Sequence, residues 1–125
     1  MSKTADHLKE AAENEKLAKV LEVRPEYCGW RCTLLFYASL HYIQAYFSSF
    51  DVPLVFEEHK QRDDAIANDS GLVRIRRDYR RLKDLSENAR YEFYKPTVAD
   101  FANDIVPSLI AIKRHLKDFF PTIEV

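Results

Sequence analysis

Glycine is nearly absent from this 125-residue sequence, which contains Gly29 and Gly71 and no others. An all-β protein of this length needs many turns, and turns recruit glycine, so a sheet-based fold is disfavoured. Hydrophobic residues make up 46% of the chain and aromatic residues 13%, which excludes a disordered segment. The length suffices for one hydrophobic core and is too short for two. The sequence therefore predicts one all-α domain over residues 1–125, an up-and-down four-helix bundle with an additional short helix.

An excess of charge of one sign is also missing, because the formal net charge is −1. Such a chain has no global field that would attract nucleic acid or an anionic membrane. Either role would need a local patch of charge.

Cysteine is scarce, and Cys28 and Cys32 lie four residues apart at the start of a predicted helix. Side chains on one rigid helix face at that separation suit a disulfide poorly, and two thiols are too few ligands for a structural zinc site. We therefore expect both thiols to be reduced and the protein to be cytoplasmic. His41 and His59 fall on different predicted elements and form no recognisable metal motif, so no metal and no cofactor are expected.

A secretory signal core is missing from the N-terminus. Residues 32–50 carry no formal charge over 19 positions, which approaches the length of a membrane span. This stretch also contains His41, Gln44, three serines and three tyrosines, which lipid solvates badly. We therefore expect the central helix of a bundle, and no membrane association.

Apolar residues recur at helical spacing in four long segments, which predicts helices near 4–22, 29–50, 72–91 and 97–119. A shorter polar helix is predicted at about 56–68. The helices are expected to pack antiparallel around a core. That core is predicted to include Leu34, Tyr37, Leu40, Phe47, Tyr79, Leu82, Phe101, Ile105, Leu109 and Ile112.

Three local signals set helix ends and bends. The run Asp51-Val52-Pro53 breaks the second helix. Thr97, followed three residues later by Asp100, resembles a capping box at the start of the last helix. Pro107 lies inside that helix and should bend or split it near Asp104.

The second predicted helix carries two stripes, which implies contact with at least two neighbours. One stripe comprises Thr33, Phe36, Leu40, Ile43 and Phe47, and the other Trp30, Leu34, Tyr37, His41, Gln44 and Ser48.

His41 lies inside this hydrophobic helix, where an unpaired polar ring costs about 1–3 kcal/mol. One interpretation is a structural histidine paired with a tyrosine or a backbone carbonyl; the other is a member of a polar cluster at a cleft. In either case we expect a bond to another helix, with Tyr79 or Arg90 as the preferred partner.

His59 and Arg62 are three residues apart and can point to one place. A base or acid beside a fixed cation suits phosphate or RNA chemistry, although the same pair can be an ordinary solvated turn.

Basic residues gather in the third long helix, where residues 74–90 hold seven basic and three acidic side chains. Such a face could bind an RNA backbone or phosphate groups. It could equally be solvated and laced with pairs such as Arg80 with Asp84, or form a dimer interface. Arg74, Arg77 and Arg81 are predicted along one side of the helix, and Arg76 and Arg80 one turn apart beside them.

Arg90 lies near Tyr91 and Tyr94, an arrangement that suits stacking on bases or packing of a loop. Ser86 and Ala89 are small enough to let another helix approach closely. Other enzyme signatures are missing: the sequence has no glycine-rich phosphate loop, no Gly-x-Ser-x-Gly and no His-Glu-x-x-His.

Four stretches, in their order, carry a resemblance to a known family. They are Leu35-Phe36-Tyr37-Ala38-Ser39-Leu40-His41-Tyr42, His59-x-x-Arg62, Tyr79-x-x-Leu82 and Leu85-Ser86-x-x-Ala89-Arg90-Tyr91. Over residues 10–118 the chain resembles a group of small bacterial and archaeal proteins of the HEPN-like (higher eukaryote and prokaryote nucleotide-binding) family.

The resemblance implies an up-and-down bundle that is often a homodimer. Many such proteins act in RNA cleavage, toxin–antitoxin pairs or defence, and others bind nucleotides or proteins. Active members carry an arginine followed after four to six residues by a histidine, and this sequence has no such pair. By position, the recurring polar residues of the subgroup correspond to His41, His59, Arg62 and Arg90, which become the candidate catalytic residues.

The expected function is therefore a HEPN-like module that binds RNA, a nucleotide or a partner protein without the usual catalytic motif. One alternative is a diverged, metal-independent endoribonuclease or toxin, and another is a purely structural partner subunit. An enzyme needs its acid–base groups within reach of one point in a cleft, so a scatter of more than about 10 Å would favour the other two readings.

Overall fold

A computed structural model of the chain describes residues 3–50, 56 and 58–125. The described residues form helices and the turns that connect them, with no strand among them, so the predicted all-α class is confirmed. The helices are α1 (Lys3–Leu21), α2 (Cys28–Ser48), α3 (His59–Asn68), α4 (Arg76–Tyr91), α5 (Val98–Asp100) and α6 (Val106–Lys117). Short 3₁₀ turns, η1 (Pro25–Tyr27) and η2 (Val73–Ile75), precede α2 and α4, and a π-helical turn, η3 (Phe101–Ile105), joins α5 to α6.

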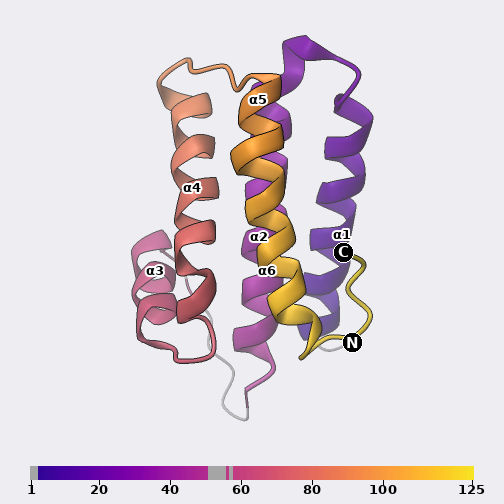
Figure 1. Ribbon diagram of the computed structural model, residues 1–125. Helices are drawn as coiled ribbons and strands as arrows, with labels where there is room; N and C mark the ends of the chain where they lie inside the picture. Colours follow the sequence, from indigo (N-terminus) through magenta and orange to yellow (C-terminus); the bar gives the residue numbers. More distant parts are fainter. Residues whose placement is uncertain (1–2, 51–55, 57) are drawn as a thin grey trace.

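Successive long helices run in alternating directions and lie side by side (Figure 1). Helix α2 packs against α1, α4 and α6, and α4 packs against α6. The short helix α3 lies outside this group, beside the first half of α4 (Figure 1). It begins at His59, slightly later than predicted, and the expected break at 51–53 lies outside the described residues.

The core forms where α2 meets α4 and α6. Eight of the ten predicted core residues are buried, and the stripe of α2 that contains Phe36, Ile43 and Phe47 is buried throughout. The prediction was wrong for Leu34 and Tyr37, because both are only partly buried.

The second stripe of α2 explains those two errors. Its first member, Trp30, is 64% exposed, and its other members are all partly exposed. Helix α1 packs against an adjacent side of α2, where Ala38 and Ala45 are fully buried, as are Ala11 and Ala18 on α1. The outer stripe therefore forms part of the molecular surface.

The last helix is distorted where the sequence predicts it. Val106 donates its backbone N–H to the carbonyl of Phe101, five residues earlier, which defines the π-helical turn immediately before Pro107. Proline has no N–H and its ring clashes with the preceding turn, so a widened turn lets the helix continue. The capping box is also present: Asp100 N–H donates to Thr97 Oγ1 at 3.1 Å, and Thr97 N–H donates to Asp100 Oδ2 at 2.8 Å.

A partly buried polar group ties three helices together. Lys113 of α6 donates to Glu15 of α1, with 2.7 Å between Nζ and Oε1, and Tyr42 of α2 donates to the other oxygen of the same carboxylate. Each of these polar groups has a hydrogen-bond partner, so the structure can accommodate the partly buried charges of Lys113 and Glu15.

No helix in the described part of the chain is both long and apolar enough to cross a bilayer.

Candidate functional site

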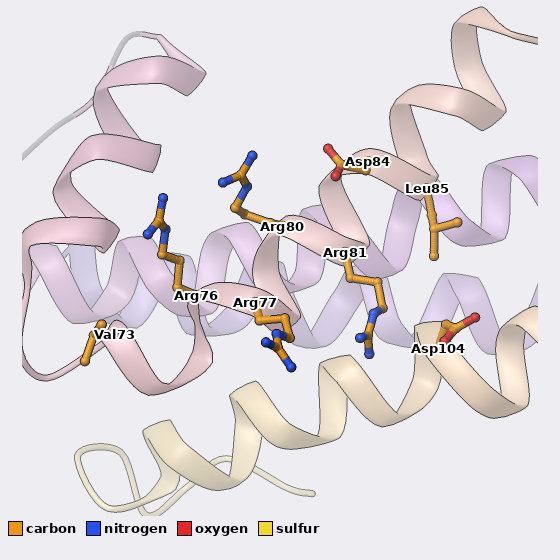
Figure 2. Close-up of a pocket in the computed structure, with 8 residues that line it drawn as sticks. All are labelled: Val73, Arg76, Arg77, Arg80, Arg81, Asp84, Leu85 and Asp104. Carbon is orange, nitrogen blue, oxygen red and sulfur yellow. The ribbon is translucent and has the colours of Figure 1, made fainter.

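A groove lined by arginines runs between α4 and the helix formed by η3 and α6 (Figure 2). Its volume is about 700 Å³. We call it the arginine groove, and it is lined by Val73, Arg76, Arg77, Arg80, Arg81, Asp84, Leu85 and Asp104.

The amphipathic pattern of α4 produces this groove. Tyr79, Leu82 and Ser86 recur at three- and four-residue spacing and are buried against the core. The residues between them must then face outward, and here they are arginines. Arg77 and Arg81 point toward α6, whereas Arg76 and Arg80 point away from it (Figure 2).

The arginines of the groove are free to bind a ligand. All four are exposed, and no ion pair joins any of them to a carboxylate within the described ranges 3–50, 56 and 58–125. The Arg80–Asp84 pair that would mark a merely solvated face is not formed. Two aspartates, Asp84 and Asp104, also line the groove, so its lining residues carry four positive and two negative charges.

The structure divides the predicted arginine face differently from the sequence pattern. Arg74 does not line the groove, although Val73, its neighbour in the 3₁₀ turn η2, does. Arg76 and Arg80 also border a second hollow, of about 360 Å³, between α3 and α4. Lys60 and Lys83 line this hollow as well, so basic side chains extend around α4 as far as α3.

A second group of polar residues gathers around the ring of Phe36. Arg62 is 6% exposed, and its Nη1 lies 3.0 Å from His59 Nδ1. The Phe36 ring centre lies 6.2 Å from that of His59 and 6.0 Å from the guanidinium carbon of Arg90. Two of the four candidate catalytic residues, His59 and Arg90, therefore lie near this ring, and Arg62 contacts the first of them.

His41 bonds to a residue that the sequence did not suggest. It is partly buried, and its Nδ1 lies 3.0 Å from the Nδ1 of His7 on α1. The expectation of a bond to another helix is correct, but the expected partners, Tyr79 and Arg90, are wrong. His41 belongs to the outer stripe of α2, which faces the start of α1 at this level, and no local signal in the sequence marks His7 as its partner.

The electrostatic environment keeps these imidazoles neutral. Burial lowers the pKa of His7, His41 and His59 below the ordinary value of 6.5, and the positive charge of Arg62 lowers all three further. The Nε of Arg62 is buried and has no hydrogen-bond partner among the described residues. A neutral histidine beside a buried guanidinium can accept a proton while the cation holds an anion.

Arg90 lies among aromatic rings, as its sequence neighbours suggested. Its guanidinium carbon is 5.4 Å from the ring centre of Tyr91 and 5.8 Å from that of Tyr37, and its Nη1 donates to Ser86 Oγ. Tyr94 instead donates its hydroxyl to Asp100.

Both cysteines are free thiols, and burial raises the pKa of Cys32 to about 12, which makes it unreactive. Among the residues that the structure describes, no three His, Cys, Asp or Glu side chains are grouped closely enough to hold a metal ion.

Comparisons with protein-family models, with curated proteins and with solved structures found no match to this chain. What it binds must therefore be inferred from the chemistry of its own residues.

Proposed function

We propose that this protein is a HEPN-like helical module that binds the phosphate backbone of RNA in the arginine groove. The observation that carries the proposal is the set of four exposed arginines that line one groove without a carboxylate partner in the described chain.

Guanidinium groups suit this task. Arginine presents a planar fork of donors that matches phosphate oxygens, and it remains charged at every physiological pH. Arg77 and Arg81 are one helical turn apart and point to the same side of α4 (Figure 2), so they can engage neighbouring phosphates of one strand. Because the net charge of the chain is −1, attraction comes from this local surface and is sensitive to salt.

The family assignment rests on the resemblance carried by residues 35–42, His59-x-x-Arg62 and the stretch from Tyr79 to Tyr91. The alternating arrangement of α1, α2, α4 and α6 is the architecture that this resemblance implies, and it supports the assignment. An arginine followed after four to six residues by a histidine is missing, which favours binding over cleavage.

The test is the salt dependence of binding to a fluorescently labelled single-stranded RNA. Replacing Arg77 and Arg81 together by glutamine should weaken binding similarly for all RNA sequences. It should also flatten the plot of log affinity against log salt by about 0.7 per phosphate contact removed.

A matched control replaces Arg74 and Arg114 by glutamine, because both are exposed and lie outside the groove. Equal losses in the two double variants would mean that total charge, and not the groove, governs binding. A change in molecular mass without a change in RNA affinity would instead assign the groove to a homodimer interface.

A second candidate function, metal-independent RNA cleavage, is favoured by the contact of His59 with the buried Arg62 and by the position of His59 and Arg90 near the Phe36 ring. We expect any such cleavage to persist in a chelator and to be abolished by His59→Ala with Arg77 and Arg81 intact. Cleavage that survives this substitution would come from another site or from a contaminant.

A further inference from the structure

A separate cavity of about 340 Å³ lies at the end of the bundle where α2 begins and α4 ends. Its walls come from four segments: Glu26 in η1, Trp30 and Thr33 on α2, Arg90 on α4, and Phe93 and Lys95 in the loop that follows α4. The volume is in the range of cavities that take small organic ligands. None of these residues lines the arginine groove.

Two aromatic side chains at this cavity are exposed beyond what packing requires. Trp30 is 64% exposed and Phe93 is 91% exposed. Phe93 also has a φ of 56°, a left-handed conformation that is unfavourable for a bulky L-residue. An exposed ring makes few packing contacts that could compensate for the strain of its backbone. Strained residues of this kind are typical of ligand-binding positions.

Positive charge surrounds the same cavity. Arg90 and Lys95 line it, and the carboxylate among its lining residues, Glu26, is paired with Arg24 at 2.8 Å. The cavity therefore combines aromatic side chains with cations, a set that matches a flat heterocycle attached to an anion.

We propose that this end cavity binds a nucleobase, with Trp30 and Phe93 providing stacking surfaces. The inference rests on the proposed RNA binding. It adds that the RNA is a single strand with at least one unstacked base, because a base that is paired in a duplex cannot enter a cavity. Arg90 and Lys95 then lie near the phosphate that the nucleotide carries.

The chain contains a single tryptophan, Trp30, so its fluorescence reports on this cavity directly. The probes are the four ribonucleoside monophosphates, with ribose 5-phosphate as a probe that has the phosphate but no base. At least one mononucleotide should quench Trp30 saturably, and ribose 5-phosphate should not.

Phe93→Gly should weaken the mononucleotide about 10-fold, in line with the loss of one stacking contact. The matched control is Phe119→Ala, which removes a half-exposed ring that contacts Tyr46 near the far end of α2 and should leave the quenching constant unchanged.

The inference is wrong if no mononucleotide quenches Trp30, if ribose 5-phosphate quenches it equally, or if Phe93→Gly leaves the constant unchanged. Binding in the groove and binding in the cavity can be tested separately, because the Arg77→Gln, Arg81→Gln double variant should keep the quenching of Trp30 by mononucleotides. If RNA binds with a normal salt dependence while Trp30 does not respond, this inference fails and the groove proposal stands.

Discussion

His7 Nδ1 lies 3.0 Å from His41 Nδ1, so one imidazole donates its N–H to the other. A proton on the accepting Nδ1 would remove the acceptor and break the bond. The pair joins α1 to α2 across 34 positions of sequence. Burial is the main reason that the pKa of each lies below 6.5, and the charge of Arg62 adds to it.

Stability should therefore fall in mild acid. With folded-state pKa values below the unfolded value of 6.5, the unfolded chain binds more protons as the pH drops through 6.5. The free energy of unfolding contributed by the pair is fully present above pH 6.5 and is lost below it. Urea unfolding at pH 7.5 and at pH 5 measures the difference, and replacing His7 and His41 together by asparagine should reduce it. An unchanged difference in that variant would assign the acid sensitivity to other groups.

Arg62 should control the pKa of three histidines at once. Replacing it by methionine removes a positive charge that lowers the pKa of His7, His41 and His59, so all three values should rise. Stability should change by no more than about 1 kcal/mol, because no carboxylate partner is left unpaired. Histidine ring resonances followed by NMR across pH 4–9 give each pKa. The matched substitution Lys83→Met should raise the pKa of His59 and leave the other two unchanged.

The helices were predictable from the sequence because their signals are local. Apolar spacing, the Thr97–Asp100 capping box and the distortion before Pro107 all operate within a few residues of each other. The errors at Leu34 and Tyr37 have another origin. Whether the second stripe of α2 is buried depends on where α1 packs, and helical periodicity carries no information about that choice.

The candidate site was predictable in composition but not in arrangement. The arginine run predicted a basic face on this helix, yet Arg74, which the spacing grouped with Arg77 and Arg81, does not line the groove. The His7–His41 bond and the cavity between Trp30 and Phe93 depend on residues far apart in sequence. Such contacts exist only once the bundle has formed.

The Lys113–Glu15 pair should contribute strongly to stability. The side chains are 9% and 23% exposed, so Lys113→Met leaves a carboxylate that is poorly solvated. We expect a loss of about 2–3 kcal/mol in the free energy of unfolding, and a smaller loss when Glu15→Gln is added. Urea unfolding of both single variants and the double variant gives the coupling energy. As a control, Glu26→Gln breaks an exposed pair with Arg24 and should leave the free energy of unfolding nearly unchanged, because solvent screens such a pair.

Phe93 should be a position where stability and binding oppose each other. Its φ of 56° costs an L-residue about 1–2 kcal/mol, which glycine avoids at an entropic cost of about 0.5–1 kcal/mol. Because the side chain is 91% exposed, its removal forfeits almost no packing. Phe93→Gly should therefore raise the free energy of unfolding by about 0.5–1 kcal/mol while it weakens nucleotide binding.

The matched control for Phe93 is Tyr91→Gly, two residues earlier. Tyr91 is 71% exposed but ends α4 in a helical conformation, so glycine there should lower the free energy of unfolding. Opposite signs for the two substitutions, measured by thermal and urea unfolding, would locate the strain at Phe93. A loss of stability in both would mean that the Phe93 ring packs in solution, and it could then not be held open for a base.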